Sequence, residues 1–353
     1  MQTKILKLND MNDAVKAIQA GQLIAFPTET VYGLGADALN EDAVKAVYAA
    51  KGRPSDNPLI VHVSSESELI PFVKEISADA QKLMDTFWPG PLTLIFKLKD
   101  ENSLPKAVTG GLETAAFRMP DKEVTRDLIK QSGRVLVGPS ANSSGKPSPT
   151  QASHVLDDLF GKIYGVIDDG PCRVGVESTV IDVSAVTALP TILRPGVITK
   201  EQIETEIGPV LIDKHLIDQQ EVPKSPGMKY KHYSPDTPVI MIDTLSEKVW
   251  LDCVEKLSQH NKAIGILAHG DLVNKLYSSA DVATFKLSVD EKSVSEAAKN
   301  LFAGLRYLDR LKPNLDVILA EVYPEVDEGT AYMNRLNKAA GGKVYSTKEI
   351  ENL

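Results

Sequence analysis

The sequence lacks the features that would place a protein in a membrane or an oxidising compartment. Its 353 residues include only two cysteines, Cys172 and Cys253, too few for a disulfide framework or a cysteine-built zinc site. No apolar run approaches the roughly 18 residues that a membrane-spanning helix needs. The first residues lack the apolar core and small-residue cleavage site of a signal peptide. We therefore expect a cytoplasmic protein with no membrane association.

Positive charge is scarce as well. The chain has 39 Lys and Arg against 48 Asp and Glu, a formal net charge of −9. Non-specific binding to nucleic acid depends on several Lys and Arg contacts to phosphate, so this balance disfavours a large RNA as the main partner. An acidic protein can still hold a small anionic ligand in a local cationic pocket. We expect any contact with RNA to be indirect or weak.

Two common catalytic motifs are also missing. The pattern G-x-x-x-x-G-K-[S/T] does not occur, which excludes an ordinary P-loop kinase. The segment from Gly138 to Asn142 begins like a nucleophile elbow, but Asn142 stands where the strained turn requires glycine. The match to a nucleophile elbow therefore fails.

Short apolar, β-branched runs alternate with helical patterns along the chain, which predicts an α/β fold. The length suits two domains. The periodicity fails in a proline-rich stretch, so we predict a first domain over 1–207, a linker over 208–238 and a second domain over 239–353. After the linker, strand-like and helical segments alternate again. That pattern predicts a smaller, doubly wound (Rossmann-like) α/β domain.

Two cations and an amide follow a predicted helix at residues 41–50, which has Asn40 as its N-cap. Lys51 and Arg53 flank a glycine, and Asn57 follows before the next strand. Lys as a point charge and Arg as a fork both suit phosphate oxygens. A cation in the last turn, a glycine beyond it and a proline after that are also ordinary helix-stop chemistry. On the sequence alone both interpretations stay open.

A polar loop follows the predicted strand at 135–138. It contains Ser140, Asn142 and Ser148, and ligands commonly bind beyond the carboxyl ends of sheet strands. A flexible connector would have a similar composition.

Other polar side chains interrupt or follow apolar strands. Arg118 lies within one and, if buried, needs a carboxylate or phosphate partner. For His62 in a strand and Thr30 in a turn, a structural role is the more common one. Ser178 and Arg194 add a further hydroxyl and a further cation.

In this order, these segments resemble a known family. Lys51-x-Arg53 followed by Ser140-x-Asn142 is similar to the K-x-R and S-x-N signature of the YrdC-like family of threonylcarbamoyl-AMP synthases. The flanking segments agree, at 27–34, 88–93, 117–120 and 177–180. The resemblance covers about residues 5–210, and the remainder looks like the long form of the family, which carries an extra C-terminal domain. It implies a twisted mixed sheet with flanking helices in the first domain.

The resemblance also implies a nucleotidyltransferase reaction. L-Threonine and bicarbonate give a carbamate, whose carboxylate attacks the α-phosphate of ATP. The products are L-threonylcarbamoyladenylate and pyrophosphate. Mg²⁺ would be bound through the ATP phosphates, without a dedicated protein site. Downstream proteins would use the adenylate to modify the tRNA adenosine next to the anticodon.

Carried over residue by residue, the resemblance implies two groups of site residues. Lys51 and Arg53 would be catalytic, by stabilising charge on the transferring phosphoryl group. The implied ATP-binding residues are Lys51, Arg53, Asn57, Thr114, Ser140, Asn142, Ser148, Arg194 and Tyr233. The implied L-threonine-binding residues are Thr30, His62, Arg118 and Ser178.

Two other functions are compatible with a YrdC-like domain. A carbamoyltransferase would need zinc-finger and acylphosphatase modules, whose cysteine pairs are missing from this sequence. A non-catalytic RNA-binding module is disfavoured by the acidic balance.

The predicted linker carries Lys and Tyr residues as well as prolines. We hypothesise that it is a lid that covers the nucleotide, with Tyr233 in contact with it. A soluble spacer is the alternative.

Overall fold

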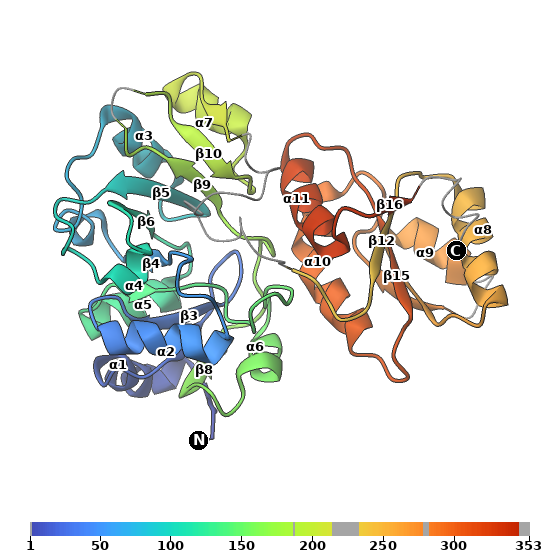
Figure 1. The fold of residues 1–353 in the computed structure, drawn as a ribbon, viewed down its shortest axis with the longest axis horizontal. Coiled ribbons are helices and arrows are strands. Elements are labelled where there is room, and N and C mark those ends of the chain that lie inside the picture. The colour runs from blue at the N-terminus through green and yellow to red at the C-terminus, as the bar shows by residue number, and fades with distance from the viewer. Residues whose placement is uncertain (1, 186–187, 214–232, 278–281, 346–353) are drawn as a thin grey trace. The chain divides into compact units, whose positions relative to one another are not determined.

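The chain folds into two compact α/β units, drawn in Figure 1. The first comprises residues 1–144 and 148–230, and the second comprises residues 145–147 and 231–353. The computed structural model describes residues 2–185, 188–213, 233–277 and 282–345.

The first unit is built on one mixed sheet. Its strands are β1 (Lys4–Leu6), β2 (Ile24–Phe26), β3 (Gly33–Asp37), β4 (Ile60–His62), β5 (Leu92–Lys97), β6 (Thr114–Arg118), β7 (Leu136–Val137), β8 (Gly165–Ile167), β9 (Thr179–Asp182), β10 (Thr191–Arg194) and β11 (Leu211–Ile212). The strand order is β1-β8-β2-β3-β7-β4-β6-β5-β9-β10-β11. β4 runs parallel to β6, whereas β5 runs antiparallel to it. The mixed sheet confirms the predicted fold class.

Helices cover both faces of this sheet. They are α1 (Met11–Gln19), α2 (Glu41–Lys51), α3 (Ala78–Phe87), α4 (Lys106–Thr109), α5 (Glu123–Ser132), α6 (Ala152–Leu159) and α7 (Lys200–Ile207), with short 3-10 turns η1 (Leu8–Asp10) and η2 (Glu66–Glu68). Apolar residues of α1 and α5 pack against β2, in a cluster that includes Ile18, Phe26 and Leu128. A larger cluster joins α2, α3 and α6 to the sheet. The burial of these apolar faces is the main source of stability for such layers.

The second unit has a parallel sheet. Its strands are β12 (Val239–Ile242), β13 (Ile264–Ala268), β14 (Ala283–Lys286), β15 (Val317–Glu321) and β16 (Val344–Tyr345), in the order β14-β13-β15-β12-β16. The helices are α8 (Glu247–Gln259), α9 (Gly270–Tyr277), α10 (Val294–Asp309) and α11 (Glu328–Ala340). α8 and α9 share one core cluster with β13, while α10 packs against α11. This arrangement confirms the doubly wound α/β fold.

The predicted linker overlaps both units at its ends. Leu211 and Ile212 form β11, which pairs in parallel with Thr191 and Ile192 of β10. Residues 233–238 belong to the second unit. The segment 214–232 lies outside the described residues, so its hypothesised role as a lid stays a prediction.

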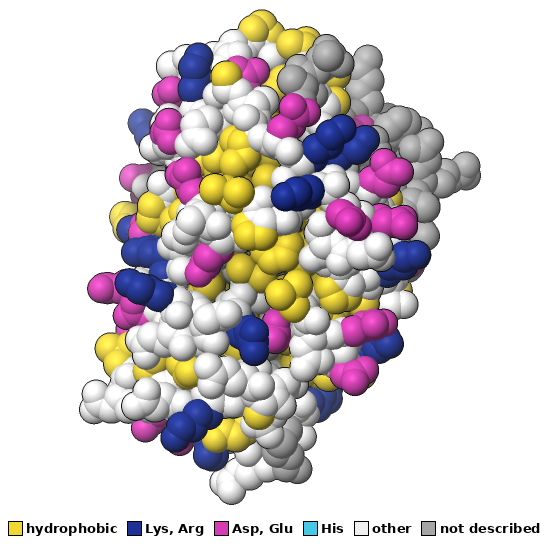
Figure 2. Space-filling view, turned by 90° about the vertical axis from the view of Figure 1, so that its left-hand side faces the viewer, with side chains coloured by type: hydrophobic (Ala, Val, Ile, Leu, Met, Phe, Trp, Pro, Cys, Tyr) yellow, Lys and Arg dark blue, Asp and Glu magenta, His cyan; other side chains and the backbone are white. Residues whose placement is uncertain are grey.

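The charge on the surface and the length and apolarity of the helices bear on what the protein can bind. On the face in Figure 2, Lys and Arg are interspersed with Asp and Glu around an apolar band. None of the helices in the described part of the chain has the length and apolarity needed to cross a membrane.

Candidate functional site

Helix α2 brings the K-x-R segment to the S-x-N segment. Asn40 caps its first turn by accepting a hydrogen bond from the Ala43 N–H, and Gly52 ends it in the left-handed region at φ 61°. This geometry buries Lys51, which is 4% exposed. Its ammonium donates to the carbonyls of Ser140 and Asn142, the latter at 2.7 Å, and lies 3.4 Å from the Asn142 side-chain oxygen. The Lys51 side chain therefore connects the K-x-R segment to the S-x-N segment, which lies about 90 residues further along the chain.

Arg53 and Asn57 lie beside this pair. The Arg53 guanidinium donates to the carbonyls of Asn57, at 3.4 Å, and Pro58, at 3.2 Å. The Asn57 side chain is 1% exposed, and neither its oxygen nor its nitrogen has a hydrogen-bond partner among the described residues. A buried amide left in that state costs about 1–3 kcal/mol. A ligand with polar atoms would remove this penalty, which makes Asn57 a ligand-binding candidate.

The loop after β7 is fixed at several points. Ser140 forms a β-bridge with Gly33, and the N–H of Ser144 donates to the Lys51 carbonyl at 2.8 Å. Ser148 donates to the carboxylate of Glu177 at 2.5 Å, and both side chains are buried. The polar loop is therefore held in place by several contacts, unlike a flexible connector.

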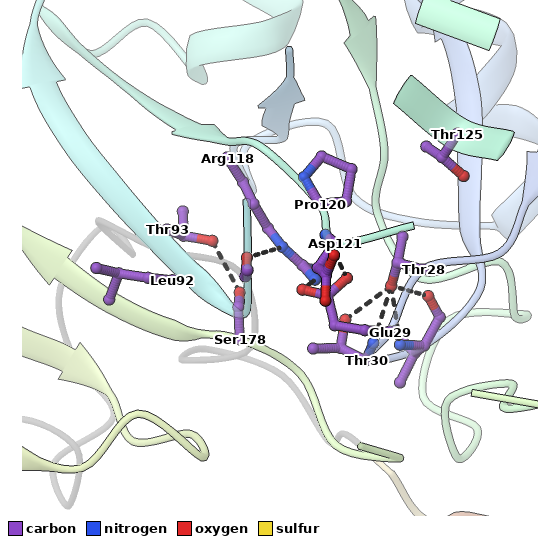
Figure 3. A network of polar contacts seen from close by, with 12 residues as sticks. Thr28, Glu29, Thr30, Leu92, Thr93, Arg118, Pro120, Asp121, Thr125 and Ser178 are labelled. Atoms are coloured by element: carbon purple, nitrogen blue, oxygen red, sulfur yellow. Dashed lines mark hydrogen bonds and ion pairs between the residues drawn. The ribbon is translucent and has the colours of Figure 1, made fainter. Parts of the chain in front are cut away.

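A second group of polar side chains surrounds Arg118, as Figure 3 shows. Arg118 is 4% exposed and forms an ion pair with Glu29, with 2.7 Å between Nη2 and Oε1. Its Nε donates to the Gly90 carbonyl at 3.3 Å. The other Glu29 oxygen accepts from the N–H of Asp121 at 3.1 Å. The buried arginine thus has the carboxylate partner that its place in an apolar strand required.

Hydroxyl groups line the rest of this second group. The Thr30 hydroxyl lies 2.9 Å from that of Thr28, and both residues are buried. The Ser178 hydroxyl lies 2.8 Å from that of Thr93 and 3.0 Å from Nη2 of Arg194. Arg194 also donates from Nε to the Ser178 carbonyl at 3.0 Å. Arg194, expected among the ATP-binding residues, therefore contacts Ser178 of the predicted threonine group.

His62 stands next to Arg118 in the register of β4 and β6. It is 2% exposed, and its Nδ1 has no hydrogen-bond partner among the described residues. Burial, and secondly the nearby Arg118 charge, lower the pKa of His62 to about 3. The imidazole is therefore neutral at physiological pH and can exchange hydrogen bonds with a ligand without carrying charge.

Thr114 and Tyr233 are the remaining predicted site residues. Thr114 is at the start of β6, opposite Lys97, with Arg118 at the other end of the strand. Because Ala116 pairs with Ile60, Thr114 lies alongside the residues just before β4, which include Asn57. Tyr233 is in the second unit, 4% exposed, with its ring 5.1 Å from that of Phe302. Its contact with a nucleotide stays a prediction.

Sequence reasoning missed several contributors to the site. Glu29, Thr28, Thr93 and Glu177 each contact a predicted site residue. The sequence did contain a signal for Glu29. It is a carboxylate in the loop after a buried strand, and Arg118, predicted to be buried, needed a carboxylate partner. In the described part of the chain, no cluster of three or more His, Cys, Asp or Glu side chains is arranged to hold a metal ion.

Comparison with known proteins covers both units. A family model described as "Telomere recombination", for Sua5, YciO and YrdC, matches residues 16–196. A second, "Threonylcarbamoyl-AMP synthase, C-terminal domain", matches residues 198–341. Two relatives named threonylcarbamoyl-AMP synthase are each 46% identical. The one from Bacillus subtilis aligns over 97% of this chain and 96% of its own length, and the one from Pyrococcus abyssi over 93% of each.

One solved structure matches the whole chain, whereas a shorter relative matches only part of it. The crystal structure of P. abyssi Sua5 complexed with L-threonine is 44% identical and superposes with a TM-score of 0.88, covering 97% of this chain and 99% of that one. A shorter relative from Mycobacterium tuberculosis, named a putative threonylcarbamoyl-AMP synthase, is 37% identical over 55% of this chain and 88% of its own length. The family predicted from the K-x-R and S-x-N segments is confirmed. The chain belongs to the threonylcarbamoyl-AMP synthases, in the long form with a C-terminal domain.

Proposed function

We propose that this chain makes L-threonylcarbamoyladenylate from L-threonine, bicarbonate and ATP, with release of pyrophosphate. The observation that carries the proposal is the contact of Lys51 with the S-x-N segment, together with the buried Asn57 amide that has no hydrogen-bond partner among the residues the structure describes. Cations and amides in a buried setting suit the phosphates of a nucleotide. The group around Arg118, with its hydroxyls and neutral imidazole, suits an amino acid with a hydroxyl side chain.

The reaction has two bond-forming steps. The threonine amine and bicarbonate combine to a carbamate with loss of water. A carbamate oxygen then bonds to the α-phosphorus of ATP as the bond to pyrophosphate breaks. In this scheme Lys51 and Arg53 stabilise the charge on the phosphoryl oxygens, while the second group orients the amino acid.

Further parts of the proposal concern the metal, the product and the location. Mg²⁺ enters as the ATP complex and supplies charge neutralisation on the phosphates. The adenylate passes to proteins that modify the tRNA adenosine next to the anticodon, so the chain itself needs little contact with tRNA. The cytoplasm is the compartment proposed for this step.

The test is pyrophosphate release from ATP, measured with and without L-threonine and with and without bicarbonate. We expect release that requires both, together with an adenylate of the expected mass. Equal release in the absence of threonine would contradict the proposal. L-Valine in place of L-threonine is a matched control, since it has the same shape without the hydroxyl.

A further inference from the structure

The group around Arg118 contains an ion pair that is not also a hydrogen bond. Nη2 of Arg118 and Oε1 of Glu29 lie 2.7 Å apart, yet neither atom has a hydrogen-bond partner among the described residues. Charge therefore holds the pair, and the hydrogen-bonding capacity of both atoms is left for other groups. The two side chains are only 5% and 1% exposed. Buried polar atoms in this state are costly unless a ligand satisfies them.

The Thr30 hydroxyl, next to Glu29 in sequence, can offer a ligand only an acceptor. The Thr28 hydroxyl lies 2.6 Å from the Val31 carbonyl, and since a carbonyl cannot donate, the Thr28 proton lies in that contact. The Thr28 and Thr30 hydroxyls are 2.9 Å apart, so Thr30 is the donor of that bond. With its one proton used, the Thr30 oxygen can accept from a ligand but cannot donate to it. Two consecutive residues thus supply two acceptors, Glu29 Oε1 and Thr30 Oγ1.

Ser178 and Arg118 supply donors to the same group. The Ser178 hydroxyl accepts from Nη2 of Arg194 at 3.0 Å and lies 2.8 Å from the Thr93 hydroxyl. Ser178 and Thr93 carry two hydroxyl protons, and the bond between them uses one. The other proton has no acceptor among the described residues, so it is available to a ligand oxygen. Nη2 of Arg118 is a second donor of this kind.

A zwitterionic amino acid matches this division of donors and acceptors. Its ammonium group only donates, and its carboxylate only accepts. The ammonium therefore suits Glu29 and Thr30, and the carboxylate suits Arg118 and Ser178. Figure 3 shows Ser178 on one side of the Arg118 guanidinium and Thr30 on the other.

Glu29 is also the carboxylate best placed to balance an ammonium charge. The other members of the group are hydroxyls, an imidazole and arginines. Asp121 lies nearby in Figure 3, but its carboxylate is 38% exposed and pairs with Arg173 at 2.8 Å. The Glu29 side chain, at 1% exposed, is shielded from water, and a charge-assisted hydrogen bond is stronger in such a place.

We propose that Glu29 binds the ammonium group of the amino-acid substrate, with the Thr30 hydroxyl as a second acceptor. The inference rests on the proposed function, which takes this group as the L-threonine site. Glu29 makes the site selective for a ligand that carries an amine, the group that reacts with bicarbonate. The alternative is a structural role, in which Glu29 only holds Arg118 in place.

The experiment measures the binding of two ligands to Glu29→Gln in the full-length protein. L-Threonine carries both charged groups, and (R)-β-hydroxybutyrate is the same molecule without the amine. Dissociation constants are measured by calorimetry in the absence of ATP, alongside melting temperature. We expect Glu29→Gln to weaken L-threonine binding at least about tenfold, because it removes a charged acceptor. Hydroxybutyrate should bind at least as tightly as to wild type, because a negative charge near its carboxylate is removed.

Two further variants control for charge and for folding. Glu123→Gln removes an exposed carboxylate in the first turn of α5 and should match wild type for both ligands. Thr30→Val removes the second acceptor and keeps the shape of the side chain. It should weaken L-threonine binding about fivefold and leave hydroxybutyrate binding unchanged, so it tests the inference even if Glu29→Gln fails to fold.

Two results would overturn the inference. L-Threonine binding by a folded Glu29→Gln equal to that of Glu123→Gln would mean that Glu29 does not hold the ammonium. An equal loss of both ligands would mean that Glu29 only holds Arg118, which both carboxylates need. The same two results decide the Thr30→Val comparison. Failure of the proposed function is seen separately, as wild-type pyrophosphate release that does not depend on threonine.

Discussion

Buried polar side chains of the first unit differ in whether the protein itself satisfies them. Arg118 and Glu29 neutralise each other as an ion pair at 2.7 Å, although the two atoms that face each other, Nη2 and Oε1, form no hydrogen bond among the described residues. Asn57 and His62 are buried with atoms that have no hydrogen-bond partner among the described residues. Since such atoms cost free energy and add no packing that an apolar side chain could not supply, we attribute them to ligand binding.

Lys51 gives the sharpest test at this scale. Lys51→Ala removes a cation that contacts the S-x-N segment, and we expect kcat to fall roughly 10²–10³-fold, the usual effect of losing one charge-stabilising donor. Lys45→Ala is the matched control, because Lys45 lies on the same helix, is exposed and pairs only at the surface with Glu41. If Lys51 serves mainly to end the helix, the melting temperature falls while activity per folded molecule survives.

His62 makes stability depend on pH. Its pKa of about 3 lies below the value of 6.5 for an unfolded chain. Between these values the unfolded state binds a proton that the native state does not, so the His62 contribution rises with pH and is complete above pH 6.5. The slope is about 1.4 kcal/mol per pH unit.

The check is urea unfolding of wild type and His62→Gln at pH 5 and pH 7.5. The variant lacks this titration, so the stability difference between the two proteins should shrink by about 2 kcal/mol on acidification. A difference that is the same at both pH values would contradict the assignment of a neutral, buried imidazole.

At the scale of elements, apolar runs predicted strands well, whereas glycine-rich segments did not. The strand predicted at 135–138 contains β7 at Leu136–Val137. β3 was missed because its sequence, Gly-Leu-Gly-Ala-Asp, has no β-branched residue. A Cβ on Gly33 or Gly35 would come within 2.7 Å of the Phe26 ring. These glycines therefore allow close packing across the sheet, which a local pattern cannot reveal.

The site residues, like the strands, could be predicted only where the signal is local in the sequence. A buried arginine predicted the need for a carboxylate, but only the fold of the loop after β2 identifies Glu29 as that partner. The K-x-R and S-x-N segments were found by their order along the chain. Their contact through Lys51 depends on the register of β7 with β3 and β4, which the sequence does not show.

Helix α2 offers a test that separates stability from chemistry. Asn40→Ala removes the oxygen that accepts from the Ala43 N–H at 3.1 Å. We expect the free energy of unfolding to fall by about 1 kcal/mol with activity per folded molecule unchanged, because Lys51 lies at the other end of the helix. Loss of activity matching that of Lys51→Ala would mean that α2 places Lys51 only when its first turn is intact.

On the scale of the whole molecule, the sequence indicated two domains but not the exact ends of the segment between them. The predicted linker began at residue 208, although Leu211 and Ile212 pair with β10 in the first sheet. Composition also gives no sign that residues 145–147 belong to the second unit. Their partners, Ser234, Asp236, Arg306 and Asp309, are separated from them by 87 residues or more, as the 159-residue separation of Arg306 from Pro147 illustrates.

Truncation after Asp213 tests whether nucleotide binding needs the rest of the chain. The cut keeps β11, and the shorter relative from M. tuberculosis aligns with 55% of this chain over 88% of its own length, so we expect the first unit to fold alone. Threonine binding should stay within about twofold of wild type, since the group around Arg118 lies in the retained part. Binding of a non-hydrolysable ATP analogue should weaken at least about tenfold, because the hypothesised lid with Tyr233 is removed. Wild-type affinity for the analogue in the truncated protein would contradict the lid hypothesis and leave the segment as a spacer.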